Sequence, residues 1–185
     1  MTRTLVLGGA RSGKSAHAEQ LATASGKRVI YVATAQAGDA EMAARIAHHR
    51  QRRDPAWSTV EETHALGGVI LRWSAPDKLV LIDCLTVWLS NLLFSGNQDF
   101  PEVGRILPPA CFDEQRALFL QALEQAAGDV ILVSNEVGMG IVPQGAISRW
   151  FADEAGRLNQ AVAARCEGAV FVAAGLPLTL KASTC

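Results

Sequence analysis

The chain has 185 residues, of which 49% are hydrophobic and 19% are charged. This composition is typical of a single globular domain and excludes a disordered chain. The formal net charge of −1 provides no global field that would attract nucleic acid or an anionic membrane, so any basic site must be local.

Neither the cysteines nor the apolar runs indicate an exported or membrane-bound protein. The four cysteines show no C-x-x-C pair and no zinc-finger spacing, which suits a reducing compartment. The N-terminal residues lack the pattern of a signal peptide, and the most apolar run, residues 79–94, is interrupted by Asp83 and Asn91. We therefore expect a cytoplasmic protein without an integral membrane segment.

Short apolar runs alternate with helical patterns along the chain. Strands are predicted at residues 4–9, 28–34, 78–84, 129–135 and 169–175, with a short additional strand at 57–62. Helices are predicted at residues 14–25, 39–53, 86–95, 113–127 and 146–166. Two long connections remain: residues 96–111, which contain several prolines and are predicted to be a loop or lid, and residues 136–145.

Continuous Val, Ile and Leu strands separated by helices indicate parallel strands that are covered on both faces. The sequence thus predicts an α/β fold of three layers, with a mostly parallel sheet between two layers of helices. We see no internal repeat and no linker, so residues 1–181 are interpreted as one domain and residues 182–185 as a tail.

The segment "GGARSGKS" satisfies the phosphate-binding pattern G-x-x-x-x-G-K-[ST] through Gly8, Gly13, Lys14 and Ser15. It follows an apolar strand directly and opens a helix, which is the context that the pattern requires. Its glycines let backbone N–H groups turn towards a phosphate, and the helix N-terminus adds partial positive charge. Lys14 is expected to reach the β- and γ-phosphates, and the Ser15 hydroxyl to hold Mg²⁺. The sequence predicts a P-loop nucleotide-binding protein.

A P-loop enzyme also needs a carboxylate near the metal, at the end of a neighbouring strand. The run "LVLIDC" places Asp83 after four apolar residues, which predicts that position for it. Asp83 could also cap the helix that follows, and this second role does not exclude a role at the metal.

The segment "EMAARIAHHRQRRD", residues 41–54, holds two of the four histidines among four arginines. On a helix, His49 continues the stripe of Met42 and Ile46 that faces the sheet, whereas His48 points elsewhere. A neutral imidazole is a competent nucleophile towards phosphorus, and arginines nearby neutralise the phosphate that it attacks. From the residues alone, a solvated basic helix or a non-covalent phosphate clamp explains the pattern equally well. A metal pair is disfavoured, because adjacent helical residues do not converge on one ion.

Several longer segments in their order and spacing resemble one enzyme family. They are "LVLGGARSGKS", "YVATAQAGDAEMAARIAHHRQRR", "LVLIDCLTVWLSNLL", "VSNEVGMGIVP" and "AGRLNQAVA". Together they are similar to the bifunctional adenosylcobinamide kinase/adenosylcobinamide-phosphate guanylyltransferase family, from the first strand to about residue 181. The P-loop is shared with many NTPases, whereas the segments around His49 and Glu136 are much more specific.

The resemblance implies a RecA-like P-loop fold, a homotrimer and two reactions in cobalamin biosynthesis. ATP or GTP phosphorylates adenosylcobinamide, and GTP then transfers GMP to adenosylcobinamide phosphate, through a guanylylated histidine that matches His49. Lys14 and Mg²⁺ serve both steps, with Ser15 and Asp83 at the metal. The implied nucleotide contacts are Gly8, Gly9, Ala10, Arg11, Ser12, Gly13, Lys14, Ser15, Ala33, Thr34, Ala35, Arg50, Gln51, Arg52, Arg53, Glu61 and Asp83. Glu62 is the alternative to Glu61.

Two other functions share the P-loop and Asp83. One is a small-molecule kinase of another pathway, in which the arginine-rich helix closes over a phosphate without a covalent step. The other is a nucleotide-dependent switch or assembly ATPase, whose product is a conformation.

Overall fold

A computed structural model describes residues 1–36, 54–96 and 99–182. These residues contain a seven-stranded sheet with the order β3-β2-β4-β5-β1-β6-β7. The strands are β1 (Arg3–Gly8), β2 (Arg28–Ala33), β3 (Ser58–Glu61), β4 (Lys78–Asp83), β5 (Asp129–Asn135), β6 (Gly168–Ala173) and β7 (Leu176–Lys181). The described helices are α1 (Lys14–Ala24), α3 (Leu66–Trp73), α4 (Leu85–Leu93), α5 (Ala110–Gln125) and α6 (Ala146–Arg165).

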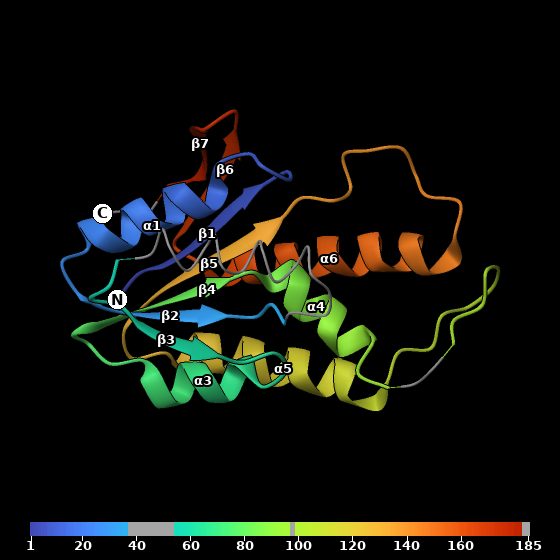
Figure 1. Cartoon of the computed structure of the whole chain (residues 1–185), viewed down its shortest axis with the longest axis horizontal. Coiled ribbons are helices and arrows are strands. Elements are labelled where there is room, and N and C mark those ends of the chain that lie inside the picture. Colours follow the sequence, from blue (N-terminus) through green and yellow to red (C-terminus); the bar gives the residue numbers. More distant parts are fainter. Residues whose placement is uncertain (37–53, 97–98, 183–185) are drawn as a thin grey trace.

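The described elements form three layers (Figure 1). Helix α1 lies on one face of the sheet, and α3, α4, α5 and α6 cover the other. Every strand pair is parallel except β6 with β7 in the described chain. The α/β class, the three layers and the mostly parallel sheet that the sequence predicts are therefore confirmed.

Alternation along each strand assigns side chains to the two faces, because successive residues point to opposite sides of a sheet. On β4, Leu79 and Leu81 join the hydrophobic cluster under α1, whereas Val80 and Ile82 join the larger cluster under the other helices. Both clusters are closed to solvent, which explains why the strand sequences are apolar throughout instead of alternating. The alternation also fixes the face on which each strand's last side chain lies.

Two elements were not predicted from the sequence. Helix α3 carries Gly67 and Gly68, which have poor helix propensity, but it buries Leu66, Val69 and Ile70 on one side. Tertiary packing against α5 outweighs the propensity.

Strand β7 contains Pro177, which argues against a strand in the middle of a sheet. The residue is tolerated because β7 is an edge strand, paired only with β6.

The close packing of α3 on α5 makes two adjacent glycines inequivalent. A Cβ atom on Gly67 would meet the carbonyl oxygen of Leu118 at 2.8 Å, whereas one on Gly68 would meet no atom within 4 Å. We predict that Gly67→Ala lowers the free energy of unfolding by about 1–3 kcal/mol through overpacking. Gly68→Ala, the matched control, should raise it by about 0.5–1 kcal/mol through helix propensity. Urea unfolding of both variants measures the difference; equal effects would contradict the packing.

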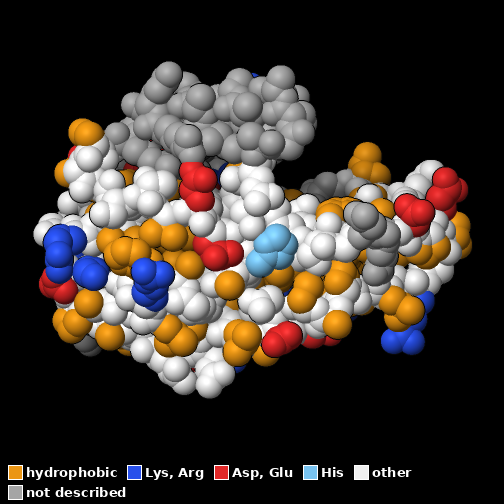
Figure 2. Space-filling model, turned by 60° about the horizontal axis from the view of Figure 1, so that its bottom comes forward, with side chains coloured by type: hydrophobic (Ala, Val, Ile, Leu, Met, Phe, Trp, Pro, Cys, Tyr) orange, Lys and Arg blue, Asp and Glu red, His pale blue; other side chains and the backbone are white. Residues whose placement is uncertain are grey.

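The surface carries exposed apolar side chains in the connections after β5 and α4. Met139, Ile141 and Val142 follow β5, and Ile141 is 98% exposed; Val103 and Leu107 follow α4. These connections extend from the same end of the molecule, where Figure 2 shows hydrophobic and charged side chains close together. Among the described helices, none combines the length and apolar character needed to cross a membrane.

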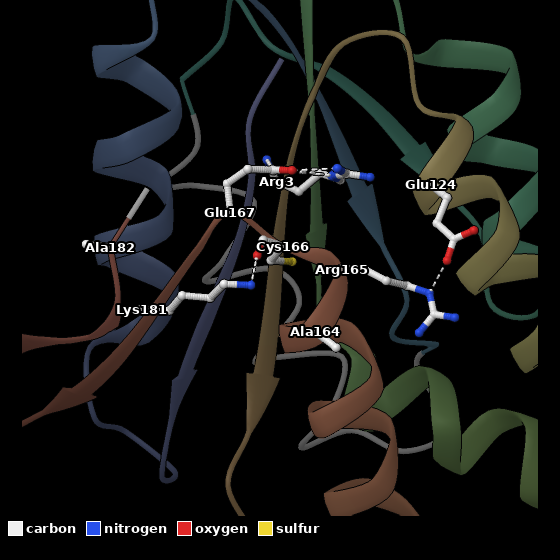
Figure 3. Close-up of a pocket in the computed structure, with 8 residues that line it drawn as sticks. All are labelled: Arg3, Glu124, Ala164, Arg165, Cys166, Glu167, Lys181 and Ala182. Carbon is white, nitrogen blue, oxygen red and sulfur yellow. Dashed lines mark hydrogen bonds and ion pairs between the residues drawn. The ribbon is translucent and has the colours of Figure 1, made fainter. Parts of the chain in front are cut away.

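At the amino edge of the sheet, charged side chains are paired with each other around a shallow pocket of about 610 Å³ (Figure 3). The Arg3 guanidinium forms an ion pair with Glu167, whose carboxylate also accepts the Arg3 backbone N–H at 2.6 Å. Lys181 Nζ donates to the backbone carbonyl of Ala163 at 3.1 Å. The ion pair between Arg3 and Glu167 joins the start of β1 to the residue that precedes β6.

The ion pair makes the stability of the fold depend on pH. The hydrogen bond from Arg3 lowers the pKa of Glu167 from 4.5 to about 2, against the opposing effect of burial. Because the folded pKa is the lower one, the stabilisation is present above pH 4.5 and is lost as the pH falls towards 2. We predict that Glu167→Gln lowers the free energy of unfolding at neutral pH, and that its difference from the native chain shrinks across this range.

Urea unfolding at several pH values measures this difference. Glu124→Gln is the matched control, because Glu124 pairs with Arg165 at a more exposed position, with 53% of its side chain accessible. Exposed pairs contribute little to stability, so this variant should stay close to the native chain. A Glu167→Gln difference that does not change with pH would contradict the role of the ionised pair.

Candidate nucleotide-binding site

The predicted phosphate loop connects the end of β1 to the start of α1, at the carboxyl edge of the sheet (Figure 1). Gly13 has a φ of 95°, in the left-handed region that favours glycine. A Cβ atom on Gly8 would lie 2.5 Å from the carbonyl oxygen of Val172, so the loop sits too close to β6 for a side chain there. The Gly175 N–H donates to the Ser12 carbonyl at 2.8 Å, which anchors the loop to the β6–β7 turn.

Lys14 is folded back over this loop. Its side chain is only 9% exposed, and Nζ donates to the Gly9 carbonyl at 3.3 Å. Ser15 follows in the first turn of α1, whose N-terminus has no side-chain cap and no acidic residue. The first N–H groups of this helix are therefore available to an anion, as phosphate binding at a helix N-terminus requires.

Asp83 ends β4, directly opposite Ala33 of β2 and Val133 of β5. It has the same parity as Leu79 and Leu81, so its side chain lies on the face that α1 covers. One carboxylate oxygen accepts the Tyr31 hydroxyl at 3.1 Å. Asp83 does not cap the following helix: the N-cap of α4 is Cys84, and no side chain caps it.

Thr34 ties the end of β2 to the residue after Asp83. Its buried hydroxyl donates to the Cys84 carbonyl and accepts the Cys84 N–H, each at 2.9 Å. The Asp83–Cys84 peptide bond is cis. Burial, with a smaller effect of the Asp83 charge, raises the pKa of the Cys84 thiol to about 11. That thiol stays protonated at neutral pH and does not act as a nucleophile.

The predicted acidic residue on β3 is Glu61, with Glu62 as the alternative. Glu61 pairs with Ala33 in register, and Ala33 pairs with Asp83, so the three residues lie in one row across the carboxyl edge. Val60 packs into the cluster under α3, which places Glu61 on the opposite face, with α1.

Glu62 faces the other way. Its Oε1 atom accepts the backbone N–H groups of His64 at 2.8 Å and Ala65 at 2.9 Å, in the turn that precedes α3. Burial acts to raise the pKa of Glu62, and these hydrogen bonds outweigh it and hold the pKa below its usual value. Strand alternation therefore gives the two carboxylates different surroundings, and only Glu61 shares the face of Asp83.

The oxygen donors of Ser15 and Asp83 suit Mg²⁺, which takes one or two protein ligands and fills its other positions with water and phosphate oxygens. Both residues belong to elements that meet at this edge, α1 and β4. The described ranges contain no cluster of three or more His, Cys, Asp or Glu side chains that could hold a metal, at this edge or elsewhere.

Of the remaining predicted site residues, some lie next to the phosphate loop and others lie outside the described residues. Gly9, Ala10 and Arg11 lie in the phosphate loop, and Ala35 lies just after β2. The predicted helix at 39–53 lies outside the described residues, and with it His49, Arg50, Gln51, Arg52 and Arg53. One contact was missed from the sequence, the hydroxyl of Tyr31 on Asp83. Its strand position, two residues before Ala33 on the same face, could have indicated it.

The chain is similar to proteins of one enzyme family along nearly its whole length. The family model for cobinamide kinase / cobinamide phosphate guanyltransferase matches residues 4–180. A bifunctional adenosylcobalamin biosynthesis protein of Pseudomonas aeruginosa is 49% identical, over 97% of this chain and 97% of its own length. A protein of the same description from Salmonella typhimurium is 41% identical, over 96% of this chain and 98% of its own length.

Solved structures support the fold class. A prototypical ATPase from the type III secretion system of pathogenic bacteria superimposes with a TM-score of 0.56 at 10% sequence identity. The match covers 96% of this chain and 56% of that protein. At this identity the similarity concerns the fold alone, and it agrees with the P-loop NTPase fold predicted from the sequence. The family match spans nearly the whole chain, and the chain belongs to the cobinamide kinase / cobinamide phosphate guanyltransferase family.

Proposed function

We propose that this protein phosphorylates adenosylcobinamide with ATP or GTP, and then transfers GMP from GTP to adenosylcobinamide phosphate to give adenosylcobinamide-GDP. The observation that carries the proposal is the family match over residues 4–180, together with a complete phosphate loop at the carboxyl edge of a parallel sheet.

In the first reaction, the acceptor hydroxyl attacks the γ-phosphorus. A new O–P bond forms, the bond between the γ-phosphorus and the β–γ bridging oxygen breaks, and the nucleoside diphosphate leaves while the hydroxyl proton passes to solvent. The transition state of phosphoryl transfer is loose, so alignment and charge neutralisation matter more than a strong base. Lys14 is the buried cation that would neutralise the charge on the phosphoryl group. Its Nζ atom already reaches over the loop to the Gly9 carbonyl. When bound at Ser15 and Asp83, Mg²⁺ would supply further neutralisation.

In the second reaction, we assign His49 as the nucleophile. Its neutral imidazole nitrogen attacks the α-phosphorus of GTP, an N–P bond forms, and pyrophosphate leaves. A phosphate oxygen of the acceptor then attacks the same phosphorus, and the N–P bond breaks to release the imidazole. Arg50, Arg52 and Arg53 bind the triphosphate in this proposal, because an arginine fork matches phosphate oxygens.

The connection between β5 and α6 is the proposed contact surface for the acceptor. It starts at the carboxyl edge, where β5 lies between Asp83 and the phosphate loop. Its apolar side chains at Met139, Ile141 and Val142 are mostly exposed. An exposed apolar patch of this kind fits a large acceptor that is partly apolar. A purely structural crossover would not need these side chains on its surface.

The family resemblance also implies a homotrimer in the cytoplasm, and we propose both for this chain. Adenosylcobinamide, adenosylcobinamide phosphate, ATP and GTP are the proposed small-molecule partners. The alternative is a P-loop kinase of another pathway that forms no covalent intermediate, and the experiment below separates the two.

Incubation with [α-³²P]GTP and Mg²⁺ tests the covalent step. We predict that the denatured protein keeps a label that is labile in acid and stable in alkali, as expected of a phosphoramidate. His49→Ala should abolish the label, because it removes the attacking nitrogen. His48→Ala is the matched control, because it removes the neighbouring imidazole, which points in another direction on the helix predicted from the sequence.

A label that survives His49→Ala and disappears in His48→Ala would contradict the assignment of His49. Protein that binds GTP and phosphorylates an acceptor without ever becoming labelled would be a plain kinase. The segment "HHRQRR" would then act as a non-covalent phosphate clamp.

The two neighbouring carboxylates at the end of β3, Glu61 and Glu62, give a second prediction. Glu61→Gln should raise the KM for GTP several-fold, because Glu61 lies in the row with Asp83. Glu62→Gln should lower the free energy of unfolding by about 1 kcal/mol through weaker hydrogen bonds before α3. Steady-state kinetics and urea unfolding of both variants measure the two effects. The reverse pattern would assign the nucleotide contact to Glu62.

A further inference from the structure

Tyr31 is a buried aromatic residue of β2 whose polar end meets the candidate site. It lies on the face that α1 covers, and only 2% of the residue is exposed. It pairs in register with Leu81 of β4, two residues before Asp83. Because side chains two positions apart share a face, the Tyr31 hydroxyl reaches diagonally to the Asp83 carboxylate. It donates a hydrogen bond to Oδ2 at 3.1 Å.

The ring of Tyr31 is held firmly by its neighbours. It stacks on the ring of Trp57, with the centroids 6.5 Å apart and the planes inclined by 22°. It also belongs to the hydrophobic cluster under α1, together with Val29 and Leu81. Close packing of the ring leaves little freedom to the side-chain torsions, so it also fixes the place of the hydroxyl. The carboxylate of Asp83 therefore meets a donor in a fixed position.

The backbone around Asp83 is fixed separately from its side chain. The Asp83 carbonyl accepts the Thr34 N–H at 3.3 Å, and the Thr34 hydroxyl bonds both backbone groups of Cys84. These bonds leave the carboxylate plane able to turn, because the last torsion of an aspartate has broad minima. Within the described part of the chain, the Tyr31 hydroxyl makes the one hydrogen bond that the Asp83 side chain receives. It engages Oδ2 and leaves Oδ1 for another partner.

A tyrosine hydroxyl has the right chemistry to orient a metal-binding carboxylate. It is a neutral donor, so it directs the carboxylate without offsetting the negative charge that attracts a divalent cation. Mg²⁺ requires a nearly ideal octahedral arrangement of oxygen ligands, and the direction of each ligand therefore matters. Groups that hydrogen-bond a metal ligand orient it, and their loss commonly lowers metal affinity about 10–100-fold.

We propose that Tyr31 is a positioning residue of the nucleotide site, whose hydroxyl holds Oδ2 of Asp83 so that Oδ1 serves the Mg²⁺ ion bound with the nucleotide. The inference rests on the proposed function, because it presupposes that the phosphate loop binds a nucleotide with Mg²⁺ at Ser15 and Asp83. Both transfer reactions use that metal in the proposed function. Loss of the hydroxyl should therefore weaken the binding of MgATP and of MgGTP alike.

The test is the substitution Tyr31→Phe, which removes the hydroxyl and keeps the packed ring. Isothermal titration calorimetry measures the Kd for MgATP and, in EDTA, the Kd for metal-free ATP. We expect Tyr31→Phe to raise the Kd for MgATP about tenfold and to leave the Kd for metal-free ATP within about twofold of the native value. A role in packing alone would not distinguish the two forms of the nucleotide.

Thr59→Val is the matched control for the loss of a hydroxyl. Thr59 pairs with Tyr31 in register on β3, is exposed, and is separated from β4 by β2. Its replacement by a side chain of similar shape should leave both Kd values within about twofold of native.

A double-mutant cycle with Asp83→Asn shows whether Tyr31 acts through the carboxylate. Asp83→Asn should itself raise the Kd for MgATP, and the addition of Tyr31→Phe should then change it little further, because the two residues share one effect. Fully additive effects would overturn the proposal. So would a native Kd for MgATP in Tyr31→Phe, or equal losses of affinity for ATP with and without Mg²⁺.

The nucleotide titrations need no acceptor, so the inference and the proposed function fail in different experiments. A native chain that binds MgATP but does not phosphorylate adenosylcobinamide would refute the proposed function. The selective loss of MgATP affinity in Tyr31→Phe would still support the positioning role. Active phosphorylation by the native chain, with the same Kd for MgATP in Tyr31→Phe, would overturn the inference and leave the proposed function standing.

Discussion

The parallel register of the central strands is the constraint on which the candidate site depends. Parallel strands bring all their carboxyl ends to one edge, and alternation decides which end residue faces α1. Through this register Glu61, Ala33 and Asp83 form one row, and Asn135 lies beside Gly8 at the phosphate loop. A slip of one residue in any of these strands would turn its functional side chain towards the opposite layer of helices. The hydrophobic clusters on both faces prevent such a slip, so core packing and site geometry have the same origin.

Polar side chains have different partners at the two edges of the sheet. At the amino edge, the guanidinium of Arg3 meets the carboxylate of Glu167, and the pair stabilises the fold. At the carboxyl edge, Lys14 donates only to a backbone carbonyl, and the Oδ1 atom of Asn135 is buried without a partner among the described residues. Polar groups left incompletely satisfied by a fold commonly mark the place where a ligand binds. A triphosphate bound at this edge would accept hydrogen bonds from the Lys14 ammonium, whereas the Oδ1 atom of Asn135 is an acceptor and needs a donor.

Much of this arrangement could be predicted from the sequence, because local patterns carry it. The phosphate loop needs glycines at fixed spacing, and Asp83 follows a continuous apolar strand, so both positions follow from the chain alone. Helix α3 could not be predicted, since packing on α5 overrides its glycines. The choice between Glu61 and Glu62 needed the observed faces of β3.

The central claim is that one phosphate loop binds the nucleotide and that Asp83 and Ser15 share its metal ion. A crystal structure with Mg²⁺ and a non-hydrolysable GTP analogue tests it most directly. The account predicts the β- and γ-phosphates against the N–H groups of the loop and Lys14, with the metal about 2.1 Å from the Ser15 hydroxyl and on the side of Asp83. A nucleotide bound elsewhere, or a metal ion held away from both residues, would contradict it.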